Sequence, residues 1–154
     1  MALYSAVAVG LFIVCAGFMW PVFRAARTDT DGSTCLRNVK ELAFAMTSYA
    51  SDHDDRLPLA QNWTDQIRMY PDSNRVFTCP ILRAGAFGYA MSNAMSHVKQ
   101  SEIDVPGEAW LLFESDILGK NAASGPESLP NPGRHHGRNV VGFADGHVKG
   151  VRSN

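Results

Sequence analysis

The chain has 154 residues, with 14 basic and 15 acidic side chains, and its formal net charge at pH 7 is −1. This balance excludes the strongly basic surface that nucleic-acid-binding proteins use, and it leaves no polybasic patch for a membrane surface. We therefore expect no nucleic-acid partner. Apart from an apolar N-terminal run and its helical extension, about 100 residues remain, which suits one small globular domain.

The apolar run covers residues 1–23 and contains no charged side chain. As a helix that rises about 1.5 Å per residue, it would extend roughly 34 Å, enough to cross a bilayer core of about 30 Å. A cleaved signal peptide would have basic residues before the run and small residues at its end, whereas this run ends in Trp20-Pro21-Val22-Phe23. A lipoprotein signal would place small residues before Cys15, where bulky ones stand instead. We therefore predict a transmembrane or filament-core helix over residues 1–23.

Residues 24–52 show the periodicity of an amphipathic helix, which we expect to continue the first one. The apolar side chains that recur at steps of three and four are Leu36, Val39, Ala43, Met46 and Ala50. Their shared face predicts packing against a head domain over residues 53–154.

Within the head domain, short apolar segments alternate with loops. Residues 61–71 suggest a short second helix, and residues 76–80 an extended segment that carries Cys79. Residues 108–114 form the most apolar segment after the N-terminal run, and their length and bulky side chains predict a central strand.

Cys35 and Cys79 lie in the polar part of the chain. In an exported domain such a pair indicates a disulfide, and in a cytosolic protein two unrelated thiols. Because the apolar run favours export, we predict a Cys35–Cys79 disulfide. In the chain-entropy model its loop of about 44 residues would contribute roughly 4 kcal/mol to stability.

The C-terminal segment 134–151 contains the clearest turn signal. Asp145-Gly146 lies between two strand-like runs, which predicts a two-residue type I′ hairpin turn. This register places Phe143 opposite Val148, so that both side chains share one face with Val141.

Histidines and acids near this segment suggest metal ligands, and the candidates are Asp116, His135, Asp145 and His147. A single site with His135 and Asp145 is disfavoured, because an intervening strand would separate them by about 20 Å or more at about 3.3 Å per residue. We expect instead that Asp145-Gly146 forms a turn and that His135 ties its loop to the sheet. The alternative is a local divalent-metal site that joins Asp116 or Glu114 to one histidine.

The chain offers no nucleophile–base pair, no paired carboxylates at catalytic spacing and no phosphate-binding loop. A metal-dependent hydrolase therefore has little support, and we predict that the protein is not an enzyme. We expect no cofactor, and the alternative is a divalent metal ion.

Four sequence blocks occur in an order that resembles a known family. They are CLRNVKELAFAMTSYASDHDDRLP at 35–58, VFTCP at 76–80, WLLFESD at 110–116 and RHHGRNVVGFADGHVKGV at 134–151. Together they resemble the bacterial type IV pilin-like (prepilin-type) proteins with a C-terminal motif of histidine, nine residues, aspartate and glycine. Here the motif residues are His135, Asp145 and Gly146.

The resemblance implies an α+β, pilin-like fold: a long N-terminal helix, its first half transmembrane, packed against a small antiparallel β-sheet. It also implies a single-pass membrane protein with an extracytoplasmic domain, or such a domain within an extracellular filament. Pro21 lies about where pilins carry a helix-kinking proline. The family's N-terminal glutamate has no counterpart, since the first acid is Asp29.

The function that the resemblance implies is that of a pilin- or pseudopilin-like structural subunit. Its N-terminal helix would associate with other copies and with other pilin-like subunits, in a filament or in a secretion-related assembly of the cell envelope. The alternative function is a membrane-anchored extracytoplasmic domain that binds a metal ion or glycan without forming filaments.

Overall fold

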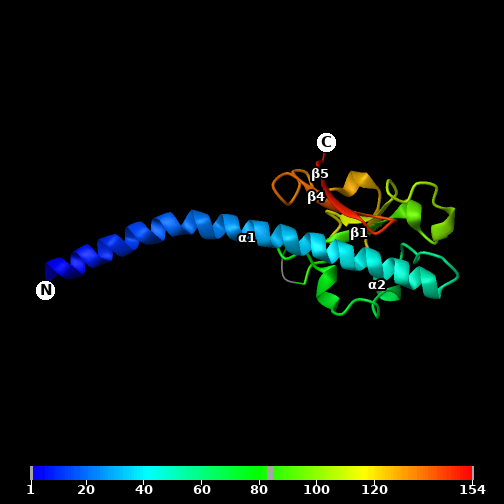
Figure 1. Cartoon of the computed structure of the whole chain (residues 1–154), viewed down its shortest axis with the longest axis horizontal. Coiled ribbons are helices and arrows are strands. Elements are labelled where there is room, and N and C mark those ends of the chain that lie inside the picture. The colour runs from blue at the N-terminus through cyan, green and yellow to red at the C-terminus, as the bar shows by residue number, and fades with distance from the viewer. Residues whose placement is uncertain (1, 83–84, 154) are drawn as a thin grey trace. The chain divides into compact units, whose positions relative to one another are not determined.

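The computed structural model describes residues 2–82 and 85–153, and within these it leaves aside the side chains of residues 2–8 and 25–30. The chain divides into two compact units, Met1–Thr30 and Asp31–Asn154. Helix α1 (Ala2–Asp52) contributes residues to both units, and every other element belongs to the second (Figure 1).

The described residues of the first unit, 2–30, all belong to helix α1. Its side chains from residue 9 to residue 24 are exposed and mostly apolar, as at Phe12, Phe18 and Trp20. Within the described residues, no helix has both the length and the apolar character that crossing a bilayer requires. The predictions of a transmembrane helix and of a single-pass membrane protein are therefore wrong.

The second unit is built around a five-stranded sheet in the order β3-β1-β2-β4-β5. The strands are β1 (Tyr89–Ser92), β2 (Trp110–Glu114), β3 (Ala123–Ser124), β4 (Asn139–Phe143) and β5 (Val148–Val151). The short helices are α2 (Trp63–Gln66), η1 (Asn74–Phe77), η2 (Asn93–Met95), η3 (Gln100–Glu102) and η4 (Pro126–Ser128).

The sheet is mixed, so the predicted antiparallel sheet is wrong. Three strand pairs are antiparallel, but β1 and β3 are parallel. Strand β2 runs opposite to β1, and the chain reverses again after β2. Strand β3 therefore lies at the outer edge of β1 and runs parallel to it.

The second-unit part of α1 buries one face in the core, as its periodicity predicts. The fully buried side chains on this face include Cys35, Val39, Leu42, Ala43, Met46 and Ala50. Leu36, expected on this face, is 43% exposed, and Cys35 occupies the buried position instead. The buried face of α1 therefore begins at the thiol of Cys35.

Both faces of the sheet are covered. The face toward α1 includes Tyr89, Met91, Leu112 and Val140, and the opposite face includes Ala90, Phe113, Val141 and Phe143. The pairing of β2 with β4 is irregular between Trp110 and Leu112, and both Leu111 and Leu112 join the α1-side core. Because side chains alternate along the strand after this irregularity, Glu114 lies on the same face as Leu112.

The β4–β5 hairpin differs by one residue from the predicted register. Gly142 pairs with Val148, and Phe143 N–H donates to His147 O at 3.0 Å. The loop therefore has three residues, 144–146, and Gly146 has the positive φ of 85° that such a loop requires at its last position. The shift places Val148 against the α1-side core, away from Val141 and Phe143.

We predict that Gly142→Ala destabilises the second unit by about 1–3 kcal/mol, the usual cost of overpacking a core. A Cβ at Gly142 would lie 2.9 Å from Val39 Cγ1 on α1 and 3.1 Å from Leu112 Cδ2. Chemical denaturation measures the loss.

The matched control is Gly150→Ala in β5, where the nearest atom to an added Cβ is Arg138 Cδ, on a flexible side chain, at 3.4 Å. Equal losses in the two variants would contradict this account of how α1 packs on β4.

Candidate functional site

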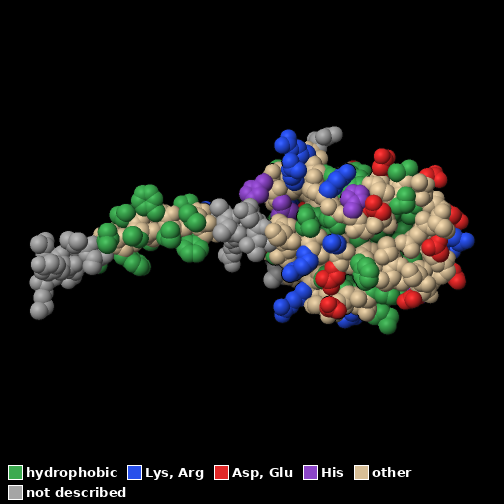
Figure 2. Space-filling view, in the orientation of Figure 1, with side chains coloured by type: hydrophobic (Ala, Val, Ile, Leu, Met, Phe, Trp, Pro, Cys, Tyr) green, Lys and Arg blue, Asp and Glu red, His purple; other side chains and the backbone are tan. Residues whose placement is uncertain are grey.

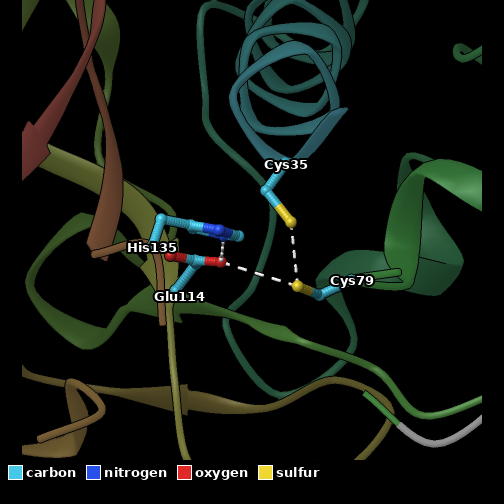
Figure 3. A group of neighbouring side chains, drawn as sticks. All are labelled: Cys35, Cys79, Glu114 and His135. Carbon is cyan, nitrogen blue, oxygen red and sulfur yellow. Dashed lines mark hydrogen bonds and ion pairs between the residues drawn. The ribbon is translucent and has the colours of Figure 1, made fainter. Parts of the chain in front are cut away.

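Four side chains with metal-ligating atoms meet in the interior of the second unit (Figure 3). Cys35 comes from α1, Cys79 from the segment after η1, Glu114 from the end of β2, and His135 from the loop before β4. One ligand atom from each lies within 4.8 Å of all the others, and all four residues are buried. We call this group the Cys-Cys-Glu-His cluster.

The segment that carries Cys79 is held against α1 by polar and steric contacts. Asn38 Nδ2 donates a hydrogen bond to Thr78 O at 3.1 Å. A Cβ on Gly88 would lie 2.6 Å from Cys79 Cβ, so only glycine allows this strand entry to pass so close to the cysteine. These contacts place Cys79 next to Cys35.

His135 is positioned by a tight turn directly before β4. His135 and Arg138 exchange backbone hydrogen bonds of 2.9 and 3.0 Å. The two residues between them, His136 and Gly137, have φ values of 52° and 76°. Two consecutive positive φ values are typical of a type I′ turn, the kind predicted nine residues later at Asp145-Gly146. The turn folds the chain back and places His135 beside the end of β2.

Glu114 is the centre of the hydrogen-bond network. His135 Nε2 donates to Glu114 Oε1 at 2.9 Å, and Val140 N–H donates to Oε2 at 2.8 Å. Cys79 Sγ lies 3.6 Å from Oε1. The carboxylate therefore connects β2, β4, the loop before β4 and the Cys79 segment, although it has no exposed surface.

Cys35 and Cys79 are neighbours, but they do not form a disulfide. Their sulfur atoms are 2.8 Å apart, and both cysteines are free. A disulfide would bring the two sulfur atoms to about 2.05 Å. The prediction of a disulfide is therefore wrong, and the contact is a hydrogen bond between the two sulfur atoms.

Contacts within the cluster shift the pKa values of its side chains. The hydrogen bond from Cys35 lowers the pKa of the Cys79 thiol to about 6, and the same bond raises the pKa of Cys35. Hydrogen bonds to Cys79 and then to Glu114 raise the pKa of His135 to about 9. The geometry thus favours a thiolate at Cys79, next to an imidazole that holds its proton.

The other three residues expected to bind a metal lie apart from the cluster. Asp116 is exposed and faces Arg134, with Oδ1 3.7 Å from Nη2. Asp145 Oδ1 accepts a hydrogen bond from the backbone N–H of His147 at 3.0 Å and contacts His147 Nδ1 at 2.6 Å. The backbone hydrogen bond from His147 lowers the pKa of Asp145. Of the four predicted candidates, the structure brings only His135 into the cluster.

The motif of His135, Asp145 and Gly146 therefore has two separate structural roles. Its histidine belongs to the buried cluster, whereas its aspartate and glycine form the β4–β5 loop. His135 Nε2 lies 2.9 Å from Oε1 of Glu114 on β2, so this histidine ties its loop to the sheet. Sequence reasoning assigned the two cysteines to a disulfide and so did not include them among the metal ligands.

Among the residues that the structure describes, the cluster is buried. A surface pocket of about 620 Å³ is lined by the neighbouring residues Thr34, Thr78 and Pro80, but by none of the four cluster residues. Cys79 is 2% exposed. A catalytic nucleophile must contact its substrate, so this burial favours a structural or metal-binding role.

We compared the chain with protein families, curated proteins and solved structures. It matches none of them. The resemblance to pilin-like proteins therefore depends on the sequence blocks and motif alone.

We predict that Glu114→Ala lowers the free energy of unfolding by about 3–5 kcal/mol, the usual cost of removing one partner from a buried ion pair. The substitution leaves Val140 N–H and His135 Nε2 without their acceptors. Glu114→Gln keeps one carbonyl oxygen and should lose less. Chemical denaturation measures both variants.

Asp116→Asn is the matched control, because it alters an exposed acid two residues away that also faces a cationic side chain. It should leave stability nearly unchanged, since exposed ion pairs contribute little. A Glu114→Ala variant as stable as this control would contradict the central role of Glu114.

Proposed function

We propose that the protein is a non-enzymatic structural subunit, pilin- or pseudopilin-like, that assembles through the N-terminal part of α1. The observation that carries this proposal is the exposed apolar surface of the first unit. From residue 9 to residue 23 every side chain is uncharged, and the large apolar ones are 50–74% exposed. Figure 2 shows apolar side chains along this stretch.

The apolar surface surrounds the helix. Leu11, Phe12, Ile13 and Val14 are consecutive and are 55–74% exposed. Successive helical residues point about 100° apart, so these four side chains face every direction around the axis. One partner on one side would leave much of this surface in water. Several copies packed around each helix would cover all of it, and burying this area drives association.

Two glycines favour close packing between helices. Gly10 and Gly17 are seven residues apart, so they lie on nearly the same side of the helix. A Cβ added at either position would meet no atom within 4 Å. Neighbouring helices can therefore approach closely along this side.

The second unit has the features of a head that each subunit carries. Its own core includes large side chains with almost no exposure, such as Trp63, Phe113 and Phe143. It therefore does not need the first unit to bury its apolar residues. A self-contained head and an uncovered apolar helix together match the division of roles that the pilin-like resemblance implies.

We predict that the double variant Phe12→Lys/Phe18→Lys abolishes self-association, because the charges would have to be buried between helices. Sedimentation and electron microscopy of the full chain in mild detergent measure assembly. Met69→Lys is the control, since Met69 is an 86% exposed apolar residue of the second unit. A wild-type chain that stays monomeric, or a double variant that still assembles, would contradict the proposal.

A parallel packing of the helices also predicts a specific cross-link. Cys15 is exposed within the apolar stretch, whereas Cys35 and Cys79 are 0% and 2% exposed. Mild oxidation of the assembled protein should therefore give dimers linked through Cys15, and Cys15→Ser should abolish them. Non-reducing electrophoresis with peptide mapping identifies the bridge, and dimers joined only through other residues would exclude parallel packing at this position.

A further inference from the structure

We infer that the Cys-Cys-Glu-His cluster is a structural zinc site that ties α1 to the sheet. The proposed ligands are Cys35 Sγ, Cys79 Sγ, His135 Nε2 and a carboxylate oxygen of Glu114. The inference goes beyond the proposed assembly function, and it depends on the second unit alone.

The set of ligand types favours zinc. Two sulfur atoms, one imidazole nitrogen and one carboxylate oxygen are all ligands that Zn²⁺ accepts in proteins, usually four at a time. Soft thiolate ligands disfavour Mg²⁺ and Ca²⁺, which prefer oxygen. A site with four protein ligands and no open position is typical of structural zinc.

The distances fit a tetrahedral site after small shifts of the side chains. Bonds of about 2.3 Å to sulfur and about 2.0 Å to nitrogen or oxygen place ligand atoms about 3.3–3.8 Å apart. The ligand atoms here lie within 4.8 Å of one another, and Cys79 Sγ is 3.6 Å from Glu114 Oε1. Two hydrogen-bonded pairs are closer, the two sulfur atoms at 2.8 Å and His135 Nε2 with Glu114 Oε1 at 2.9 Å. Zinc would replace these hydrogen bonds, and the pairs would separate by about 1 Å or less.

The burial of all four side chains also supports a metal site. Glu114 and Cys35 have no exposed surface, and Cys79 and His135 are 2% and 9% exposed. Buried ionisable side chains are normally paired or bound to a metal, and apolar residues of similar size often stabilise a core as well or better. Four such side chains at one point therefore indicate a role beyond packing, and zinc coordination uses all of them.

Groups around the cluster can support the ligands. Val140 N–H donates to Glu114 Oε2, which leaves Oε1 to face the cluster. Asn38 Nδ2 donates to the hydroxyl of Tyr89 at 3.3 Å and to Thr78 O, directly before Cys79, at 3.1 Å. Such outer hydrogen bonds orient metal ligands and stabilise thiolates.

The site also links distant parts of the chain. Its residues come from α1, from the segment after η1, from the end of β2 and from the loop before β4. All four are buried, so we expect the ion to bind as the second unit folds and to exchange slowly afterwards.

The test is the metal content of the full chain, refolded under reducing conditions with Zn²⁺ and then dialysed against metal-free buffer. We expect about one zinc per chain by elemental analysis. Refolding with Co²⁺ should give the intense visible bands of tetrahedral cobalt and a thiolate-to-cobalt charge-transfer band. Oligomeric state does not affect these readings, so failure of the assembly proposal would be distinguishable from failure of this one.

Cys79→Ser and His135→Ala should each lower zinc affinity at least about tenfold, since each loses one ligand. The matched controls are Cys15→Ser and His147→Ala, which remove an exposed cysteine and an exposed histidine that lie outside the cluster. Both controls should keep one zinc per chain. Circular dichroism shows which variants fold. If a variant does not fold, the rise in the Tm of the wild-type chain with zinc concentration measures the zinc affinity instead.

Three results would overturn the inference. The first is a wild-type chain with free Cys35 and Cys79 thiols and no stoichiometric zinc. The second is a Cys35–Cys79 disulfide in the purified chain together with no zinc uptake after reduction and refolding. The third is a folded Cys79→Ser or His135→Ala variant that binds zinc as tightly as the wild-type chain.

Discussion

The buried carboxylate of Glu114 is the interaction on which the second unit depends. It accepts hydrogen bonds from His135 Nε2 and Val140 N–H and lies next to Cys79 Sγ. A carboxylate without exposed surface is costly unless each oxygen has a partner. The turn at His136-Gly137 and the close approach of Gly88 to Cys79 supply those partners. Local backbone geometry and buried electrostatics therefore support each other at this point.

The two units differ in whether their apolar side chains are buried within one chain. The second unit buries its apolar side chains on both faces of the sheet, so its core is complete within one chain. The first unit exposes its apolar side chains along residues 9–23. The proposed assembly would cover this second surface with other copies. The proposed zinc site would act only within the head, where it would hold α1 against the strands.

Several expectations failed because they depended on contacts between distant residues. The predicted Cys35–Cys79 disulfide is wrong, because both thiols are free, and the sequence could not show that Glu114 and His135 lie beside them. The loop at Asp145-Gly146 was placed correctly, but it contains three residues, and this moves Val148 to the other face of the sheet. The parallel pairing of β1 with β3 depends on how the chain returns after β2, for which the sequence has no local signal.

The sequence by itself determined the features that arise from local pattern. The spacing of Val39, Ala43, Met46 and Ala50 was enough to predict the buried face of α1, because helical periodicity is a local property. The apolar segment 108–114 likewise predicted a central strand, which the structure shows as β2 over Trp110–Glu114. Only the tertiary structure decided that Cys35, Cys79, Glu114 and His135 meet. They are far apart in the chain, and their proximity depends on the irregular β2–β4 pairing, on the turn at His136-Gly137 and on the packing of α1 against the sheet.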